Sequence, residues 1–409
     1  MNPVTKPLPE PADKAAVVRP ALPPALAALI GQPVDAIDTP SLVVDLDAIG
    51  RNLKRMAEFA AKHNVKFRPH AKMHKSASLA KLQIQAGASG VCVQKTSEAE
   101  ALAAAGVRNI YISNEVTAPA KLHRVAALAQ ALAAQNGQLA IAVDSMAGVQ
   151  RLAAAMASAN ATGAAVVDVF VEIDVGQGRC GVAPGTAAVT LAQEITRHPT
   201  LNFAGLQAYH GRAQHLRTVH ERREAIARTV DDVQRTRQLM EAAGLRVGLV
   251  TGAGTGTFAL EAASGVYGEL QAGSFLFMDA DYAQNERDPA QPQFEHALFV
   301  KTQVMSRHGD RAVCDAGHKS HAIDSGLPRV HTLAGGPALQ YFNGGDEHGI
   351  LRATDAGAPL PAIGDVLWLI PGHCDPTVNL HDYLIGVRGG LVDGMVERII
   401  RVDARGALT

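Results

Sequence analysis

The sequence predicts an α/β fold in which a closed (β/α)8 TIM barrel is followed by a mainly β domain. Three observations support this fold. From about Pro40, short β-branched or apolar runs alternate with longer alanine-rich helical stretches, as in βα units around a parallel sheet. These runs number eight, which is the count that closes such a barrel. After about Pro289 the chain changes to strand-like pieces separated by Gly, Pro and Asp turns. An open, doubly wound sheet is the alternative fold.

Each candidate strand is a short run rich in apolar or β-branched residues. In chain order the runs are VKFRPHA (65–71), GVCVQ (90–94), NIYIS (109–113), LAIAVDS (139–145), VVDVFVEID (166–174), LNFAGLQAYHG (201–211), RVGLVTGAG (246–254) and ELQAGSFLFMD (269–279). Helical stretches such as SEAEALAAAG and KLHRVAALAQALAAQ separate them. The later β domain is indicated by ALFVKTQVMSR, RAVCDAG, DVLWLIP and YLIGVRGGLVDGMVERIIRV.

These patterns divide the chain into four parts. Residues 1–35 are rich in proline and alanine, and we expect them to form a flexible leader. They lack the basic start and the unbroken apolar stretch of a signal peptide. Residues 36–48 contain a strand that precedes the barrel and joins the C-terminal β domain. We assign the barrel to residues 49–285 and the β domain to residues 286–409.

The charge balance argues against large charged partners. Lysine and arginine (38) nearly balance aspartate and glutamate (39) in the 409 residues, so the chain carries no electrostatic footprint for nucleic acid or an anionic membrane. No window approaches the roughly eighteen continuous apolar residues that a spanning helix needs. We therefore expect a small-molecule partner. The four cysteines lie far apart and form no CxxC pair, which is typical of a reduced, cytoplasmic protein.

Polar residues close several of the candidate strands, where the active site of a (β/α)8 barrel lies. They occur in the segments RPHAK, GQGRCG, YHG, GAGTGT and AGS. Lys72 follows the first strand and would emerge into the barrel mouth. Apolar walls there would lower the pKa of its amine and allow it to form a Schiff base. The alternative is a solvated surface lysine.

Two glycine-rich turns follow the last two barrel strands, where barrels commonly hold phosphate. Their small residues allow main-chain N–H groups to approach an anion closely. No GK[ST] follows the first turn, and neither turn fits GxGxxG after the first strand of an open sheet. A phosphorylated cofactor is therefore favoured over a nucleotide. The candidate phosphate residues are Gly252, Gly254, Thr255, Gly256 and Thr257 in the first turn, and Gly273 and Ser274 in the second.

Arg179 and Tyr209 would enter the same mouth after the fifth and sixth strands. An arginine in this place could contact a pyridine nitrogen and would disfavour protonation of that nitrogen. The alternative for Arg179 is a salt bridge within the barrel rim, for example with Asp174.

The segment PGHCDPTVNLH carries His373 and Asp375 two residues apart after an apolar run. On an extended segment, residues i and i+2 point to one side, so an imidazole and a carboxylate could bind one ion while Cys374 faces away. Nitrogen and oxygen ligands completed by water suit Mn²⁺, Mg²⁺ or Zn²⁺. A shift in register would bring the Cys374 thiolate to the ion instead and would favour Zn²⁺.

Together these segments resemble the fold-type III pyridoxal-phosphate enzymes, specifically the D-threonine aldolase branch that also contains 3-hydroxy-D-aspartate aldolases and D-serine dehydratases. The resemblance covers nearly the whole chain outside residues 1–35. It is carried by RPHAKMHK, EIDVGQGRCGV, LQAYHG, TGAGTGTF, LQAGSFLFMDADY, DAGHKSHAIDSGLP, GGDEHG and PGHCDPTVN.

The resemblance implies an alanine-racemase-like barrel with a β domain, usually assembled as a homodimer. It implies that Lys72 carries pyridoxal 5'-phosphate (PLP), that Arg179 contacts its pyridine nitrogen and that Tyr209 contacts the cofactor. The two glycine-rich turns would hold the phosphate. His373 and Asp375 would bind a divalent metal, for which Mn²⁺ and Mg²⁺ are favoured and Zn²⁺ is an alternative.

The implied activity is that of a carbon–carbon lyase. Such an aldolase cleaves D-β-hydroxy-α-amino acids, similar to D-threonine or 3-hydroxy-D-aspartate, to glycine and an aldehyde. A base must take the proton of the β-hydroxyl group, and His210 or a metal-bound water is the candidate. His70 and His74 would either line the mouth or order its loop.

Three rival functions fit the same scaffold. A dehydratase would eliminate the β-hydroxyl group of D-serine or D-threo-3-hydroxyaspartate, but dehydratases of this family resemble one another in having histidine and cysteine at the two metal positions. A non-catalytic PLP carrier resembles the barrel alone, which leaves the C-terminal domain without a counterpart. A racemase has no evident task for a metal pair.

Overall fold

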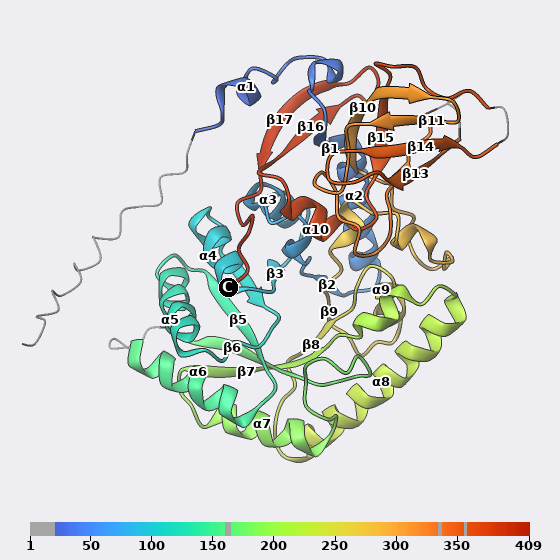
Figure 1. Cartoon of the computed structure of the whole chain (residues 1–409). Helices are drawn as coiled ribbons and strands as arrows, with labels where there is room; N and C mark the ends of the chain where they lie inside the picture. The colour runs from blue at the N-terminus through green and yellow to red at the C-terminus, as the bar shows by residue number, and fades with distance from the viewer. Residues whose placement is uncertain (1–20, 160–164, 334–337, 356–357) are drawn as a thin grey trace, which may run out of the picture.

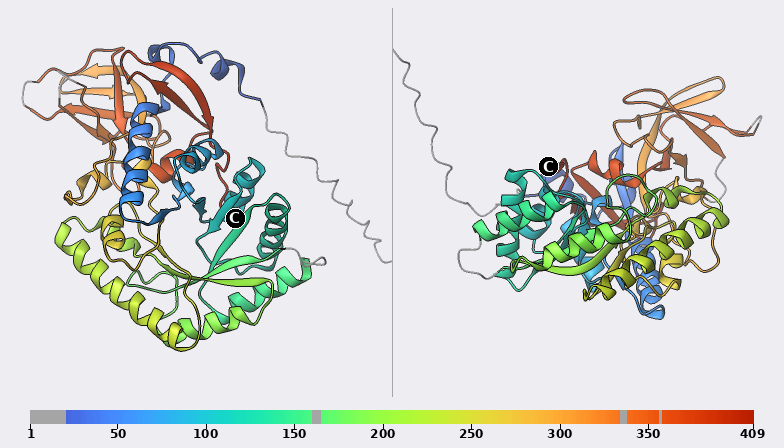
Figure 2. Two further views of the ribbon diagram at one scale, coloured as in Figure 1. Left: turned by 180° about the vertical axis from the view of Figure 1, so that it is seen from behind. Right: turned by 90° about the horizontal axis from the view of Figure 1, so that it is seen from below.

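The computed structural model describes residues 21–159, 165–333, 338–355 and 358–409. Within these ranges the strands form two sheets, one in a barrel and one in a β domain that lies beside it as a second lobe (Figures 1 and 2). The predicted fold, a (β/α)8 barrel with a C-terminal mainly β domain, is confirmed. No helix in the described ranges is long and apolar enough to cross a bilayer.

The barrel sheet is parallel, and its strands follow the order β2-β9-β8-β7-β6-β5-β4-β3. A bridge between His70 and Cys92 joins the chain after β2 to β3, and the N–H of Cys92 donates to the carbonyl of Pro69 at 2.9 Å. These contacts bring the two ends of the sheet together. The strands are β2 (Lys66–Phe67), β3 (Val91–Val93), β4 (Asn109–Ile112), β5 (Gln138–Val143), β6 (Val167–Glu172), β7 (Leu201–Ala208), β8 (Leu249–Gly252) and β9 (Glu269–Leu270).

The first and last barrel strands are much shorter than the sequence predicts. β2 and β9 have two residues each, and each is soon followed by a 3-10 turn, Ala71–Met73 after β2 and Ser274–Leu276 after β9. The polar residues predicted to close these strands lie in or beside these turns. The short strands therefore leave more chain at the barrel mouth.

Helices cover the outside of the barrel (Figure 1). The helix α2 begins where the Asp45 carboxylate accepts the N–H groups of Asp47 and Ala48 at 2.9 and 3.0 Å. The long helix α8 begins with a capping box between Thr218 and Glu221. The helices are α2 (Leu46–Lys62), α3 (Ala77–Gln85), α4 (Thr96–Ala104), α5 (Pro119–Ala133), α6 (Met146–Ala159), α7 (Thr186–Thr196), α8 (Val219–Ala242), α9 (Phe258–Ala263) and α10 (Cys374–Asn379).

The second sheet contains β1 (Ser41–Asp45) as well as the C-terminal strands. β1 pairs antiparallel with β10 and parallel with β16, so the segment before the barrel lies within the β domain. The main path of the sheet runs β13-β14-β11-β10-β1-β16-β17, and β15 pairs with β10 and β12. Its other strands are β10 (Leu298–His308), β11 (Arg311–Cys314), β12 (Arg329–Val330), β13 (Leu339–Asn343), β14 (Gly349–Ala353), β15 (Val366–Ile370), β16 (Tyr383–Arg388) and β17 (Met395–Arg401).

The flexible leader was predicted to extend to residue 35, but the structure shows fixed contacts before that position. Residues 1–20 lie outside the described residues, whereas the segment after them contains a short helix, α1 (Pro24–Ala27). Val34 is 1% exposed, and Pro33 bridges to Met395, the first residue of β17. The buried ammonium group of Lys301 donates to the carbonyls of Val34, Asp35 and Ile37 at 2.6–3.2 Å. Apolar burial and these three hydrogen bonds fix residues that their composition suggested would be flexible.

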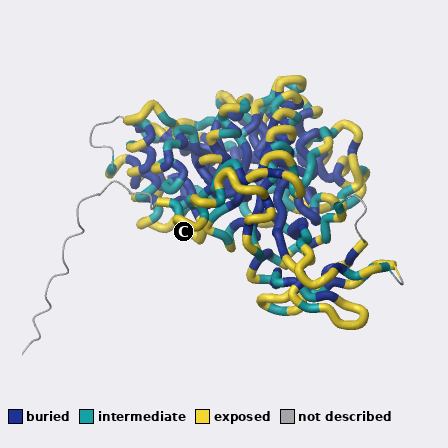
Figure 3. The backbone as a smooth tube through the Cα atoms, turned by 90° about the horizontal axis from the view of Figure 1, so that it is seen from above, coloured by how far each residue is buried: buried dark blue, intermediate teal, exposed yellow. Residues whose placement is uncertain are grey.

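The buried residues lie along the inside of the barrel and between the lobes (Figure 3). Inside the barrel the core includes a polar network. The hydroxyl of Tyr111 donates to Gln207 Oε1 at 2.9 Å, and Gln271 Nε2 donates to the same oxygen at 2.7 Å. Gln271 also donates to Thr251 Oγ1 at 2.9 Å. Because these buried groups are bonded to one another, they form a fixed floor below the barrel mouth.

Candidate active site

A pocket of about 130 Å³ lies where the barrel mouth meets α10 of the β domain. A larger cavity of about 640 Å³ adjoins it and shares Thr255 and Tyr282. We assign the active site to the smaller pocket because most of the predicted chemical groups converge there. The predicted site residues that line it are Lys72, Tyr209, Gly254, Thr255, Gly273, Ser274, His373 and Asp375. The predicted site residues outside its lining are Arg179, His210, Gly252, Gly256 and Thr257.

Lys72 lies on the 3-10 turn after β2, with its Nζ atom 3.4 Å from Asp375 Oδ2. Its side chain is 41% exposed, so the amine faces the pocket without being sealed from solvent. Burial lowers the pKa of this amine, but the Asp375 carboxylate outweighs burial and the net pKa is raised. The predicted lowering of the pKa by apolar walls is therefore wrong, because a carboxylate from the other lobe stands beside the amine.

The two histidines next to Lys72 have different tasks. The Nδ1 atom of His70 accepts the main-chain N–H of Lys72 at 3.3 Å, while the His70 ring lines the pocket. His74 is fully buried, and its Nδ1 atom accepts the N–H of Ser76 at 3.0 Å. Its Nε2 atom lies 3.1 Å from Gln83 Oε1. His70 thus lines the mouth and orders the Lys72 turn, whereas His74 only orders the loop.

The glycine-rich turns present unpaired main-chain donors to the pocket. Among the described residues, the N–H groups of Gly254, Thr255, Gly273 and Ser274 donate no hydrogen bond, and all four residues line the pocket. Ala253, inside the first turn, has a positive φ of 72°, a conformation that costs energy for a residue other than glycine. Buried donors without acceptors are costly, so this cradle is suited to an anion such as a phosphate group.

The other three predicted phosphate residues lie behind the cradle. Gly252 ends β8, and its carbonyl accepts the N–H of Gln271 at 2.7 Å. The N–H of Gly256 donates to Gln214 Oε1 at 3.0 Å, and the hydroxyl of Thr257 donates to Glu261 Oε1 at 2.7 Å. These groups already have partners, so they support the turn rather than face a ligand.

Arg179 and Tyr209 come together at the mouth. The guanidinium carbon of Arg179 lies 5.8 Å from the centre of the Tyr209 ring, within the range of a cation–π contact. On the barrel rim, Arg179 lies nearest to a different acid from the predicted Asp174. The Nη2 atom of Arg179 is 4.0 Å from Glu172 Oε1, whereas Asp174 accepts the N–H groups of Gly176 and Gly178. The Arg179 side chain is 46% exposed, which leaves its guanidinium group accessible to a ligand.

His373 and Asp375 converge, but on a helix start instead of an extended segment. His373 is the N-cap residue of α10, and Asp375 lies in the first turn. The predicted i, i+2 geometry of a strand is therefore wrong, although His373 Nε2 is still only 3.9 Å from Asp375 Oδ1. Two ligand atoms that each lie about 2.1 Å from one ion can be up to about 4.2 Å apart, so the pair fits a divalent ion. The helix start places both side chains at the pocket.

Asp324 orients His373 from the opposite side. Its Oδ2 atom lies 2.7 Å from His373 Nδ1, which fixes the tautomer whose Nε2 atom faces Asp375. Burial lowers the pKa of His373, but the Asp375 and Asp324 carboxylates outweigh burial and raise it. This arrangement, in which a carboxylate holds the outer nitrogen of a ligand histidine, is common around bound metals.

Cys374 does not offer a thiolate to this pair. The residue is fully buried, and burial together with Asp279 and Asp375 raises the pKa of its thiol well above the usual range. Its main-chain N–H donates to Asp279 Oδ2 at 3.1 Å, which ties α10 to the loop after β9. The register of the predicted metal pair is therefore that of His373 and Asp375.

His210, the predicted base, is not among the residues that line the pocket. A Cβ atom added to Gly176 would lie 2.9 Å from its Nε2 atom, so the ring packs against the loop after β6. His215, five residues later, lines the pocket instead. Its Nδ1 atom lies 2.6 Å from Oδ2 of the buried Asp281. This contact holds a proton on Nδ1 and leaves the Nε2 lone pair free to accept a proton.

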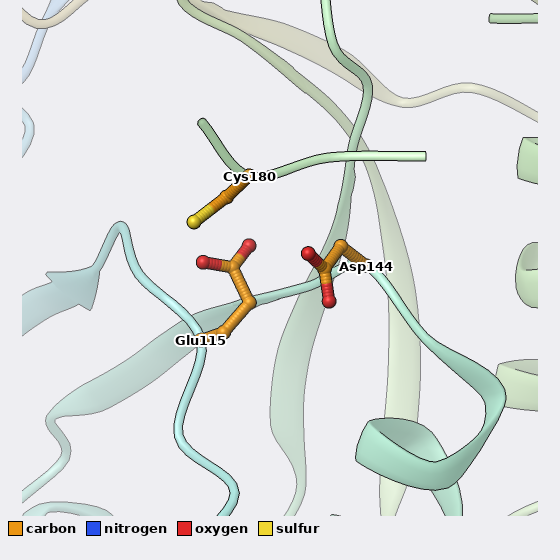
Figure 4. A group of neighbouring side chains, drawn as sticks. All are labelled: Glu115, Asp144 and Cys180. Carbon is orange, nitrogen blue, oxygen red and sulfur yellow. The ribbon is translucent and has the colours of Figure 1, made fainter. Parts of the chain in front are cut away.

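Glu115, Asp144 and Cys180 form a separate acidic cluster after β4, β5 and β6 (Figure 4). Their possible ligand atoms all lie within 4.8 Å of one another, and Figure 4 shows the Glu115 carboxylate between the other two side chains. Burial and Glu115 raise the pKa of Cys180 to about 11 and that of nearby Glu172 to about 9. None of the three residues lines the pocket, so this cluster is not part of the active site that we assign.

Sequence reasoning missed Asp324, His215, Asp281 and Gln271. Asp324 lies within the quoted motif DAGHKSHAIDSGLP, and His215 follows YHG by four residues in YHGRAQH. These positions carried a weak signal, because nothing local to them indicates which partner they meet. Only the fold brings Asp324 to His373 and Asp281 to His215.

The chain is similar to known families along both lobes. Residues 44–281 match the family described as alanine racemase, N-terminal domain, and residues 297–387 match the putative serine dehydratase domain. D-threonine aldolase of Arthrobacter sp. is 45% identical over 387 residues, covering 94% of this chain and 97% of that protein. 3-hydroxy-D-aspartate aldolase of Paracoccus denitrificans (strain Pd 1222) is 42% identical over 388 residues, covering 93% and 95%.

Two further comparisons separate the aldolases from the dehydratases. The crystal structure of D-threonine aldolase from Filomicrobium marinum aligns with a TM-score of 0.87 at 45% identity, covering 93% of this chain and 99% of that chain. D-threo-3-hydroxyaspartate dehydratase of Delftia sp. (strain HT23) is only 30% identical over 361 residues, covering 83% of this chain and 92% of that protein.

Proposed function

Because this chain belongs to the alanine racemase-like family that contains D-threonine aldolase and 3-hydroxy-D-aspartate aldolase, we propose that it is a lyase that cleaves D-β-hydroxy-α-amino acids to glycine and an aldehyde. The single observation that carries this function is the content of one pocket. A lysine amine, a cradle of free N–H groups and a histidine–aspartate pair meet there.

The residues of the pocket fit PLP and a divalent metal. We assign Lys72 to the cofactor's aldehyde carbon, the cradle to its phosphate, Tyr209 to its ring and Arg179 to its pyridine nitrogen. PLP supplies an electron sink for the carbanion left at Cα, and the metal supplies Lewis acidity. His373 and Asp375 hold the metal in this proposal, with Mn²⁺ or Mg²⁺ ahead of Zn²⁺ because one ligand is a carboxylate oxygen and neither is a thiolate.

The chain's own residues then handle the protons. His215 Nε2 takes the proton of the substrate's β-hydroxyl group, and Asp281 stabilises the imidazolium that forms because it already lies 2.6 Å from Nδ1. Cleavage of the Cα–Cβ bond leaves negative charge at Cα. The proton that His215 took is returned to that carbon through the Lys72 amine, which lies in the same pocket, and this yields glycine.

The alternative is a dehydratase on the same scaffold, and the observations favour it less. The dehydratase relative is 30% identical, against 45% for the aldolase. The second metal position carries Asp375, and the neighbouring Cys374 is buried and does not line the pocket. We further propose that the protein is a homodimer, as the family resemblance implies, and that it is cytoplasmic, because its four cysteines lie far apart and form no CxxC pair. Its balanced charge supports a D-amino acid as a small-molecule partner and no binding to nucleic acid or membrane.

One assay tests this function. The purified protein is supplied with PLP and incubated with D-threonine, D-3-hydroxyaspartate or D-serine, with a chelator or with added Mn²⁺, Mg²⁺ or Zn²⁺. We expect glycine and an aldehyde in equal amounts from one of the first two substrates, and loss of activity in chelator. Ammonia with a 2-oxo acid as the products would favour the dehydratase and contradict the proposal.

The metal assignment has its own test. The substitution Asp375→Ala should abolish the dependence of activity on added divalent ion and reduce the bound metal, while the visible absorbance of bound PLP remains. Asp382→Ala, in the loop that follows α10, is the matched control and should change neither quantity. Full activity of Asp375→Ala in chelator would contradict the assignment.

A further inference from the structure

Gln214 is a fully buried side chain directly behind the phosphate cradle. It lies in the 3-10 turn Gly211–His215, and its amide is bonded on both sides. Its Oε1 atom accepts the N–H of Gly256 at 3.0 Å, while Nε2 donates to Thr257 Oγ1 at 2.8 Å and to the His210 carbonyl at 3.2 Å. One amide therefore joins the glycine-rich turn after β8 to the loop after β7.

The turn is packed against Gln214 without spare room. A Cβ atom on Gly254 would lie 2.5 Å from Gln214 Oε1, and a Cβ atom on Gly256 would lie 2.5 Å from the Gln214 carbonyl oxygen. Only glycine fits at either position while Gln214 is in place. The path of the turn, and hence the direction of its free N–H groups, is set by this contact.

The network extends beyond the turn on both sides. Thr257, which accepts from Gln214, donates in turn to the buried Glu261 at 2.7 Å. From the other side, Gln291 Nε2 donates to the Gly256 carbonyl at 3.2 Å. Both polar groups of the Gly256 main chain are thus occupied, and the free donors of the cradle in this turn are those of Gly254 and Thr255.

Gln214 also precedes His215, which lines the pocket. The two residues share one 3-10 turn, and the Gln214 carbonyl accepts Asn285 Nδ2 at 2.8 Å, which holds that turn from the outer side. A change in the Gln214 side chain would therefore loosen the cradle first, since the three hydrogen bonds of this amide end at Gly256, at Thr257 and at the His210 carbonyl.

We propose that Gln214 is a positioning residue for the cofactor's phosphate group: it holds the turn after β8 so that the N–H groups of Gly254 and Thr255 converge with those of Gly273 and Ser274. This inference rests on the proposed function only in the assignment of PLP to the pocket. It requires that loss of the Gln214 amide weakens binding of the phosphate and spares binding of the rest of the cofactor.

The test compares PLP with pyridoxal, which lacks the phosphate. Apoprotein of the full chain is titrated with each compound, and binding is followed by visible absorbance. In Gln214→Met, a substitution of similar volume without polar atoms, we expect the affinity for PLP to fall about tenfold to a hundredfold. The affinity for pyridoxal should change by less than about twofold, so the preference for the phosphorylated compound should shrink by nearly the same factor as the PLP affinity.

Gln177→Met is the matched control, because Gln177 Oε1 accepts the N–H of Gly211 in the same 3-10 turn at 2.8 Å but makes no hydrogen bond to the glycine-rich turn. It should keep the wild-type preference. If Gln214→Met fails to fold, Gln214→Leu takes its place, since it also lacks the polar atoms that bond to Gly256 and Thr257 and adds no charge. An unchanged preference in a folded Gln214 variant would overturn the inference. A wild-type protein that binds neither compound would instead overturn the PLP assignment of the proposed function and the inference with it.

Discussion

The two walls of the pocket are built by different means. The barrel wall offers a ligand mainly main-chain N–H groups in the turns after β8 and β9, with Lys72 as the covalent anchor that we propose. The β-domain wall acts through side chains at the start of α10, where His373 and Asp375 converge and Asp324 orients the imidazole. The comparison leads us to expect that cofactor binding and metal binding can be separated, although the two walls meet where Lys72 Nζ lies 3.4 Å from Asp375 Oδ2. We expect that each wall can be disabled while the other keeps its ligand.

The largest expected effect comes from removing the anchor of the barrel wall. Lys72→Ala should abolish the visible absorbance of bound PLP and lower turnover by at least about 1000-fold, because the amine that binds the cofactor is gone. Absorbance spectra and single-turnover kinetics measure both effects. If the walls are separable, the metal content of this variant stays at the wild-type value. An active, still yellow Lys72→Ala protein would contradict the assignment.

The second-largest effect is expected from removing the proposed base, His215. His215→Gln should lower kcat by about 10²- to 10⁴-fold, the range expected for loss of a general base, while both bound PLP and bound metal remain. The matched variant is His210→Gln, whose ring lies outside the pocket and packs near Gly176, and it should retain kcat within about threefold. A collapse of kcat in His210→Gln alone would reverse the assignment of the two histidines.

A smaller effect should follow from the residue behind the metal pair. Asp324→Ala removes the carboxylate that lies 2.7 Å from His373 Nδ1, and metal affinity should fall about 10- to 100-fold. Titration of the metal-depleted protein with Mn²⁺ measures this affinity. PLP affinity should not change, which sharpens the separation of the walls. Ile323→Ala, which changes an exposed apolar side chain next to Asp324, is the control, and an equal loss of metal affinity there would argue for a general disturbance of the loop.

The smallest effect concerns stability behind the barrel wall. Burial raises the pKa of Glu261 from 4.5 to about 7. Between these values the folded protein holds a proton that the unfolded chain has released, so the free energy of unfolding falls as pH rises from about 4.5 to about 7. Glu261→Gln removes this contribution. Its stability relative to the wild-type apoprotein should rise between pH 5 and pH 8, by up to about 3 kcal/mol. Denaturant unfolding at the two pH values tests this, and a difference that does not vary with pH would contradict it.

The sequence predicts the barrel wall better than the β-domain wall, and the reason is physical. A main-chain cradle needs small residues next to one another, so GAGTGT and AGS carry their signal locally. Lys72 likewise follows directly from its position at a strand end. The alternation of strands and helices was equally local, and it predicted the barrel and the insertion of β1 into the other sheet.

Local sequence patterns could not predict contacts between residues that lie far apart in the chain. Asp324 and His373 are 49 positions apart, and His215 and Asp281 are 66 apart. The start of α10 at Cys374 was missed because a helix of six residues carries no periodicity, so the metal pair was placed on a strand. The pKa of Lys72 was predicted in the wrong direction because the carboxylate that raises it, Asp375, lies 303 positions away along the chain (375 − 72).

The position of β1 has a consequence for how the protein is made. This strand leaves the ribosome before the barrel segments, yet both of its neighbours, β10 and β16, emerge only after them. Until about residue 388 has been synthesised, β1 exposes an unpaired apolar edge. The nascent protein therefore exposes the apolar edge of β1 while the barrel segments are synthesised. We expect chaperones to bind a chain that ends before β16.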